Sequence, residues 1–242
     1  MKTIGLIGGM SWESTAVYYR RLNEGVRDRC GGLGSAEILL RSVDFARIVE
    51  MQQRGAWEQA AATMAALGRS LERGGADIVL ICTNTMHKLA DAVAQAVSIP
   101  LLHIVDATAA PIKAHGLRRP LVLATQYTME QSFYLDRMRR WNLSPIVPDS
   151  VADRRLVHSV IFDELCRGIV RDEARAAYRA IIAKGESAGA DCVVLGCTEI
   201  GLLIGQSDTD LPLFDSTLLH ADAALDFALA EAAQPARALA AD

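Results

Sequence analysis

Two segments of the chain have nearly the same sequence, and each ends in a side chain that could move a proton. Residues 75–84 read GADIVLICTN, and residues 189–198 read GADCVVLGCT. In this alignment Cys197 corresponds to Thr83 and not to the neighbouring Cys82. A thiol can act as an acid or, once deprotonated, as a base, whereas a neutral hydroxyl is weaker in both roles. If both segments contribute to one site, it has a thiol on one side and a hydroxyl on the other.

Cys197 is expected where a buried strand meets the following helix. Cysteines are often buried and only fill space, but a residue at a strand exit can reach a ligand. The next helix would offer free N–H groups and the positive end of its dipole, which lower the pKa of a thiol. Glu199 could accept the thiol proton or simply begin that helix. Alternation along the other strand directs Cys82 into the core and Thr83 to the opposite side, so Cys82 is the less favoured thiol.

Short β-rich runs alternate with helix-length amphipathic patterns along the whole chain. Strands that are apolar on both faces and separated by helices are typical of parallel sheets covered by helices. We therefore predict an α/β fold. The expected strands are 3–8, 37–42, 78–82, 101–104, 121–124, 145–147, 192–195 and 213–214. The expected helices are 14–29, 57–73, 86–97, 129–141, 154–166, 173–187 and 218–232.

The internal repeat extends beyond the first pair of segments. Residues 99–103 (IPLLH) match residues 211–215 (LPLFD), and residues 4–8 resemble residues 120–124 less closely. The repeat predicts two pseudo-symmetric domains, each a parallel sheet flanked by helices, with the active site in the cleft between them.

No Gly/Ser/Pro-rich linker separates the two halves, so we expect them to be joined by loops. The first half is expected at residues 1–100 and the second at 101–215. The C-terminal helix, about residues 216–232, is expected to pack on the first half. Residues 233–242 are Ala-rich and indicate a flexible tail.

The segments expected at the carboxyl ends of the strands are short, polar and rich in hydroxyls. They are residues 8–11, 83–85, 125–128 and 197–199. Ligands of open parallel sheets bind at this edge. Residues 83–85 could simply cap the following helix, but the same free N–H groups can hold a carboxylate. Across a pseudo-twofold axis, Thr83 and Cys197 would approach a ligand from opposite sides.

The composition excludes several classes of partner. A net charge of −4 and scattered Lys and Arg residues provide no basic surface for nucleic acid. The sequence has no apolar run of about 18 residues and begins on a strand without a signal-like leader, so we expect a cytoplasmic protein with no membrane partner.

Cofactors and metals are not expected either. The 5 cysteines are irregularly spaced and form no CxxC pair, which predicts free thiols and no metal site. Gly5, Gly8 and Gly9 lack the GxGxxG order of a dinucleotide site, so we expect them to let a small ligand approach the backbone or to form a turn.

Taken together, these motifs resemble the aspartate/glutamate racemase family, whose members work without pyridoxal phosphate. The resemblance rests on residues 4–15 (IGLIGGMSWEST), 84–87 (NTMH), Thr125-x-x-Thr128, 197–199 (CTE) and 214–217 (FDST). It implies two similar α/β halves, an active site between them, no cofactor and a homodimer.

The resemblance also implies roles for individual residues. Family members use two cysteines, one from each half, on opposite faces of the substrate's α-carbon. The second position is Cys197, whereas the first is Thr83, so the chain resembles a subgroup with threonine there. The expected substrate-binding residues are Met10, Ser11, Gln52, Asn84, Thr85, Thr125, Thr128, Thr198 and Glu199. The Arg and Lys that grip a side-chain carboxylate in some aspartate racemases have no clear counterpart, and Asp163 and Glu164 occupy the region expected for the Lys.

The expected function is cofactor-independent racemisation of an amino acid, either aspartate or glutamate or a broader set. Two alternatives stay open. One thiol suffices to protonate one face of an enolate, so the chain could be a decarboxylase of a malonate-type substrate, as in the wider superfamily. It could also be a non-catalytic carboxylate-binding protein, which a ligand would stabilise without proton exchange.

Overall fold

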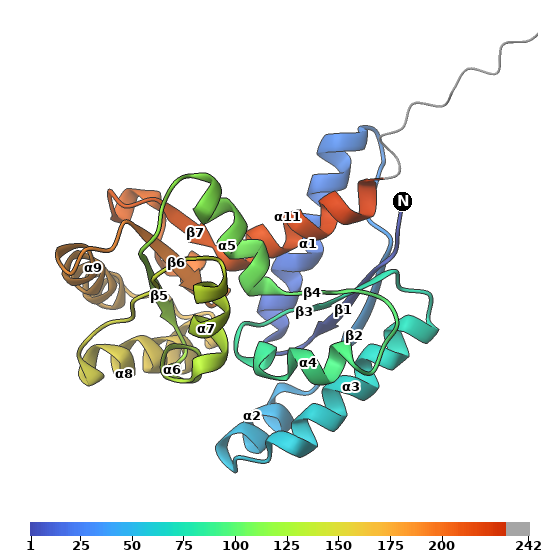
Figure 1. Cartoon of the computed structure of the whole chain (residues 1–242), viewed down its shortest axis with the longest axis horizontal. Helices are drawn as coiled ribbons and strands as arrows, with labels where there is room; N and C mark the ends of the chain where they lie inside the picture. Colours follow the sequence, from blue (N-terminus) through green and yellow to red (C-terminus); the bar gives the residue numbers. More distant parts are fainter. Residues whose placement is uncertain (231–242) are drawn as a thin grey trace, which may run out of the picture.

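The computed structural model describes residues 1–230, which form two parallel sheets with helices around them (Figure 1). The first sheet has the order β2-β1-β3-β4, with β1 at Ile4–Gly8, β2 at Ile38–Ser42, β3 at Ile78–Ile81 and β4 at Leu101–Leu102. The second has the order β5-β6-β7, with β5 at Pro120–Ala124, β6 at Cys192–Gly196 and β7 at Leu213–Asp215. The predicted α/β fold is confirmed. The tail expected at 233–242 and the end of the helix expected at 218–232 lie outside the described residues.

The two sheets repeat one topology. Neighbours β1, β3 and β4 have the same order as β5, β6 and β7, which accounts for the repeat in the sequence. The strand expected at 145–147 is reduced to one parallel bridge, in which Ile146 pairs with Leu121 beside β5, as β2 lies beside β1. Pro145 and Pro148 have no N–H to donate, and this limits the pairing to a single residue.

Helices connect all the strands. Those before residue 100 are α1 (Trp12–Cys30), α2 (Phe45–Gln53), α3 (Trp57–Arg73), a 3-10 turn at Thr85–Leu89 and α4 (Ala90–Ala94). The middle of the chain forms α5 (Ile104–Ala114), α6 (Gln126–Glu130), α7 (Ser132–Arg140), α8 (Val151–Ser159), a π turn at Val160–Glu164, a 3-10 turn at Leu165–Arg167 and α9 (Asp172–Ser187). The last elements are α10 (Ile200–Leu203), a 3-10 turn at Gln206–Asp208 and α11 (Ser216–Leu229).

Helices α2 and α5 were not among the helices predicted from the sequence. Asp44 caps α2 by accepting a hydrogen bond from the N–H of Ala46. The strand expected at 101–104 stops at Leu102, because His103 caps α5 through its Nδ1 atom. Pro111 lies inside α5, and an internal proline argues against a helix when only the sequence is considered.

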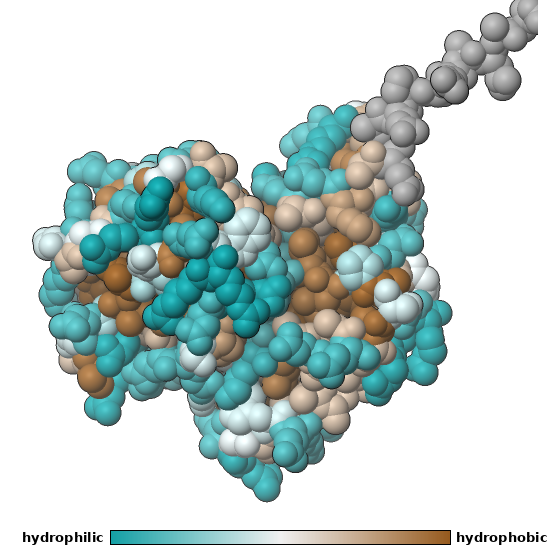
Figure 2. Space-filling view, in the orientation of Figure 1, coloured by the Kyte–Doolittle hydropathy of each residue, from teal (hydrophilic) through white to brown (hydrophobic). Residues whose placement is uncertain are grey.

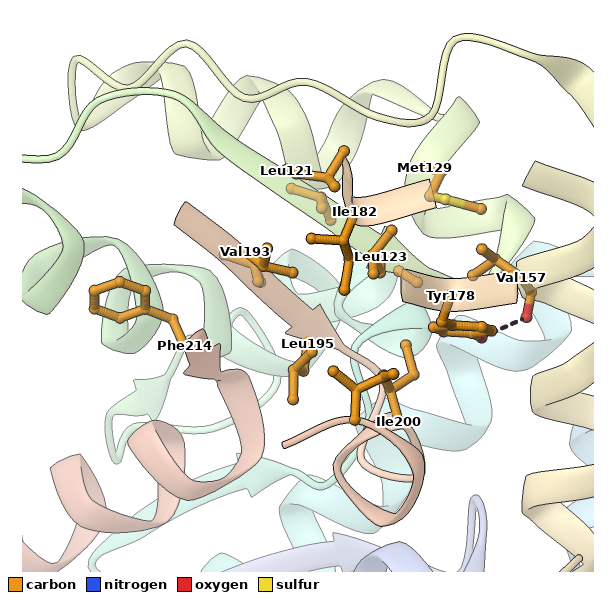
Figure 3. Close-up of a cluster of buried hydrophobic side chains, with 14 of the residues drawn as sticks. Leu121, Leu123, Met129, Val157, Tyr178, Ile182, Val193, Leu195, Ile200 and Phe214 are labelled. Carbon is orange, nitrogen blue, oxygen red and sulfur yellow. Dashed lines mark hydrogen bonds between the residues drawn. The ribbon is translucent and has the colours of Figure 1, made fainter. Parts of the chain in front are cut away.

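Helices α5 and α11 occupy equivalent places after β4 and β7, and each packs on the other half. Buried residues of α5 join the core built around β5 and β6, which Figure 3 shows in close-up around Leu123 and Val193. Alanines of α11 pack with Tyr18 and the strands of the first sheet, and Figure 1 shows α11 crossing α1. A Cβ added to Gly25 of α1 would lie 2.2 Å from Leu225, so this glycine lets the two helices approach closely.

Sheet membership corrects the boundary expected between residues 100 and 101. Leu101–Leu102 pairs with β3 and belongs to the first sheet, so the division made from the sequence falls one strand too early. The crossover occurs instead at His103, where the chain leaves β4 and enters α5.

The outer surface is mixed in character. Hydrophilic side chains cover most of the face seen in Figure 2, and apolar residues gather on the first half in the area between α11 and α4. Within residues 1–230, each helix is either too short or too polar to cross a membrane.

Candidate active site

A small cavity lies between the halves, where β1, β3, β5 and β6 end. Its volume is about 20 Å³, room for about one water molecule. The predicted residues that line it are Met10, Gln52, Thr83, Asn84, Thr85, Thr125, Cys197, Thr198 and Glu199. Of the remaining predicted residues, Ser11 and Thr128 stand behind this lining and contact it through hydrogen bonds. The sequence analysis missed six further residues that line the cavity: Phe45, Met86, Ile161, Phe162, Cys166 and Gly196.

Cys197 follows the last residue of β6 and contacts Glu199. Its thiol donates a hydrogen bond to Oε2 of Glu199 at 2.9 Å, and Oε1 accepts from the hydroxyl of Ser11 at 2.5 Å. The Glu199 side chain makes no capping hydrogen bond to α10. Of its two expected roles, proton acceptor and helix start, the side-chain geometry favours the first, because the carboxylate is turned to the thiol.

The prediction of a lowered thiol pKa was wrong. Burial and the nearby carboxylate of Glu199 raise the pKa of Cys197 well above its ordinary value. The helix after Cys197 is the four-residue α10, too short for a large dipole effect. Cys197 is therefore a thiol in this structure, and a thiolate requires that its proton leave with the help of Glu199 or of a bound ligand.

Thr83 lies at the corresponding position in the first half, just after β3. Its side chain lines the cavity, whereas Cys82 is fully buried in the core with Ile4 and Tyr18. The alternation predicted for these two residues is thus observed. Burial raises the pKa of the Cys82 thiol as well.

His87 holds the backbone of Thr83 in place. Its Nε2 atom accepts a hydrogen bond from the backbone N–H of Ile104 at 3.1 Å. The proton therefore resides on Nδ1, which donates to the carbonyl oxygen of Thr83 at 2.8 Å. His87 ties the end of β3 to the start of α5, and this places it in a structural role.

Hydroxyl groups connect the strand ends of the two halves. Thr85 and Thr125 are 2.9 Å apart, and Thr128 lies within 3.4 Å of both. Ser14 and Thr198 form a second contact across the interface at 2.5 Å. Hydroxyls can donate or accept, so these pairs can turn towards a bound carboxylate or ammonium group.

Two buried amides have hydrogen-bonding capacity to spare. Asn84 donates from Nδ2 to Ser216 at 3.0 Å, while its Oδ1 is buried without a partner among the described residues. Gln52 reaches in from α2 and donates to the sulfur of Met86 at 3.1 Å. A thioether is a weak acceptor, so this contact only partly satisfies the Gln52 amide.

The chain is thus an α/β protein of two similar halves, and its candidate site lies between them. A thiol and a hydroxyl line this site from equivalent strand ends. The family model described as Asp/Glu/Hydantoin racemase matches residues 7–224. The chain therefore belongs to this family of isomerases, which confirms the family suggested by the sequence motifs.

Two solved structures and one protein related in sequence agree with this assignment. A candidate Asp/Glu racemase from Yersinia pestis has 48% sequence identity and a TM-score of 0.89, over 95% of this chain and 100% of that one. An aspartate racemase homologue from Pyrococcus horikoshii has 32% identity and a TM-score of 0.83, over 94% and 99%. A broad specificity amino-acid racemase, RacX from Bacillus subtilis, is 24% identical over 149 residues, 61% of this chain and 63% of that protein.

Proposed function

We propose that the chain is a cofactor-independent amino-acid racemase in which Cys197 and Thr83 act on opposite faces of the α-carbon. The observation that carries this proposal is that both side chains line one cavity from equivalent positions after β6 and β3. Inversion at carbon needs one group to remove the α-proton and a second to deliver a proton from the other side.

The first step requires a base in the second half of the site. Glu199 is 2.9 Å from the thiol and takes its proton, which leaves a thiolate to remove the α-hydrogen. Ser11 steadies the carboxylate from the first half through its 2.5 Å hydrogen bond. The ammonium group of the substrate would offset the negative charge that burial disfavours on Cys197.

The carbanion that results must be stabilised by the protein, since the proposal includes no cofactor as electron sink. The free Oδ1 of Asn84 and the hydroxyls of Thr85 and Thr198 provide acceptors and donors for the substrate's ammonium and carboxylate groups. Thr83, or a water molecule that it holds, then returns a proton from the opposite side. Solvent replaces that proton, and Glu199 releases to solvent the proton that it took from the thiol.

Substrate and assembly complete the proposal. The names of the relatives point to aspartate, glutamate or a broader set of amino acids as substrates. We also propose a cytoplasmic homodimer, which light scattering on the purified chain and fractionation of cells would test.

Proton exchange in deuterated water tests the activity directly. The full chain is incubated with each common amino acid, and loss of the α-proton is followed by NMR while chirality is followed by chiral chromatography. Exchange together with inversion supports the racemase. Release of carbon dioxide from an aryl- or alkylmalonate, with no amino acid exchanged, would identify the decarboxylase. Thermal stabilisation by amino acids without either reaction would identify a binding protein.

A further inference from the structure

The lining of the cavity has no cationic side chain to receive a second carboxylate. Among the described residues that line it, Glu199 is the one charged group, and Arg, Lys and His are absent. The hydroxyls and amides near Thr83 and Thr198 can serve the α-carboxylate and the ammonium group, which every amino acid carries. A side-chain carboxylate would have to enter the same small space as Glu199.

The hollow outside the cavity has the same character. Gln52 and Phe162 border both spaces, and the outer hollow also contains His158 and Asp163. Burial lowers the pKa of His158, so its imidazole is neutral at pH 7. The charged group that remains among the described residues of this hollow is the carboxylate of Asp163.

The arginines in and directly after α2 do not supply the missing charge. Arg47 and Arg54 line a different hollow, one that shares no residue with the cavity. Each is paired with an acid on its own helix or at its cap, Arg47 with Asp44 and Arg54 with Glu50. Both are exposed to solvent, and neither lines the cavity.

The wall away from the strand ends is apolar and aromatic. Phe45 of α2 stacks on Phe162 of the π turn, with ring centroids 6.4 Å apart and an angle of 15° between the planes. Ile161 and Met86 extend this wall, and the Gln52 amide is its polar group. Such a wall favours a side chain that is apolar, or that ends in a neutral group able to bond to an amide.

We infer that this site selects α-amino acids with an uncharged side chain, which lies against Phe45, Phe162 and Gln52. The inference rests on the proposed racemase activity and narrows its substrate class. A side-chain carboxylate would lose its hydration, gain no cation and be repelled by Glu199, whereas an amide or thioether of the same size avoids all three costs.

Pairs of amino acids with the same shape test the inference in the wild-type chain. Glutamine is compared with glutamate, and asparagine with aspartate, by kcat/KM for α-proton exchange and for inversion. We expect each amide to exceed its acid by tenfold or more, and methionine to exceed glutamate as well. Equal or higher kcat/KM for the acids would overturn the inference while leaving the racemase standing. No exchange with any amino acid would overturn both.

A substitution in the wall provides the second test. In Gln52→Arg, the new guanidinium offers a partner to a side-chain carboxylate, so we expect the glutamine-to-glutamate ratio to fall at least tenfold. Gln59→Arg adds the same charge on the exposed face of α3 and should leave the ratio within twofold of wild type. Circular dichroism shows whether Gln52→Arg is folded. A folded Gln52→Arg with an unchanged ratio would refute the placement of the side chain, and if it fails to fold, the wild-type pairs decide alone.

Discussion

The thiol of Cys197 and the carboxylate of Glu199 are joined by a 2.9 Å hydrogen bond inside a buried cavity between the two halves. Ser11, from the other half, fixes the second carboxylate oxygen. An acid and a base are thus held together in a place where burial alone would keep the thiol protonated. In the proposed mechanism Glu199 takes the thiol proton when a substrate arrives, although its carboxylate also contributes to the raised pKa of Cys197.

Removing the proton acceptor is expected to slow the reaction strongly. In Glu199→Gln the amide keeps the size of the side chain but cannot take a proton from Cys197. We expect kcat for α-proton exchange to fall about 10²- to 10³-fold, the usual contribution of a general base. Steady-state kinetics by NMR would measure it. Glu173→Gln, an exposed acid of α9, is the matched control, and a Glu199→Gln enzyme within twofold of wild type would contradict the assigned role.

Replacing the thiol itself is expected to abolish both measurable activities. A serine hydroxyl at position 197 is a far weaker acid, so Glu199 can no longer generate the base. We expect Cys197→Ser to show neither exchange nor inversion while keeping its fold by circular dichroism. Cys30→Ser removes an exposed thiol and should behave as wild type. Activity retained in Cys197→Ser would remove this residue from the mechanism.

The hydroxyl opposite Cys197 is expected to separate exchange from inversion. L and D amino acids have equal free energy in water, so kcat/KM for racemisation is the same in both directions whatever stands at position 83. The thiol can exchange the proton of one enantiomer without help from Thr83. We therefore expect deuterium exchange to outpace inversion for one enantiomer, by family analogy the L form. NMR and chiral chromatography on one reaction would show this, and equal rates for both enantiomers would argue against it.

Restoring a thiol at the first position is expected to speed inversion. In Thr83→Cys, the side chain opposite Cys197 becomes a much stronger acid, so protonation of the second face is easier. We expect racemisation to rise and the exchange-to-inversion ratio to approach one for both enantiomers. Thr128→Ser, behind the lining, is a conservative control for disturbance of the hydroxyl cluster. Slower racemisation in a folded Thr83→Cys would mean that Thr83 does more than donate a proton.

The strand ends could be predicted from the sequence, whereas the apolar wall could not. Thr83 and Cys197 follow buried β-rich runs, and the repeat places those runs in equivalent positions, so local pattern was sufficient. Phe45 and Phe162 come from α2 and from an irregular turn after α8, and they meet only through tertiary packing. No spacing in the sequence brings two such distant residues together.

The prediction of a lowered pKa for the Cys197 thiol failed for a related reason. The sequence shows that a helix follows Cys197, but its length depends on where Ile204 leaves the helical conformation. The sequence shows that Glu199 is close to Cys197, but not which way its carboxylate points. That orientation depends on a hydrogen bond from Ser11, which lies far away in the chain. The packing of α11 on the first half was expected from the sequence, whereas the crossing of α5 to the second half depends on its tertiary packing against β5 and β6.

Three buried histidines are expected to make the fold sensitive to acid. His87, His103 and His220 lie together where β4, α5 and α11 meet, with ring centroids of His87 4.6 Å from His103 and 5.6 Å from His220. Tyr18 donates to Nδ1 of His220, whose Nε2 donates to the carbonyl of Leu102 at 3.0 Å. Each ring is therefore a neutral imidazole, and the nitrogen that accepts a hydrogen bond has no room for a second proton.

Burial lowers the pKa of His103 and of His220 from 6.5 to about 3, and that of His87 well below 6.5. A lowered pKa means that the unfolded chain binds protons first, so stability is full above pH 6.5 and is lost as the pH falls towards 3. At pH 5, His103 and His220 should each lower the free energy of unfolding by about 2 kcal/mol relative to its value above pH 6.5. Urea unfolding at pH 7.5 and pH 5 measures the difference.

A variant separates this effect from the titration of surface acids. In His220→Gln, the amide can accept from Tyr18 and donate to Leu102 but does not titrate, so about 2 kcal/mol of the loss between pH 7.5 and pH 5 should disappear. His115→Gln replaces an exposed histidine and should leave the full loss in place. If His220→Gln and wild type lose the same free energy over this range, the acid sensitivity has another source, because His220 is then not protonated on unfolding.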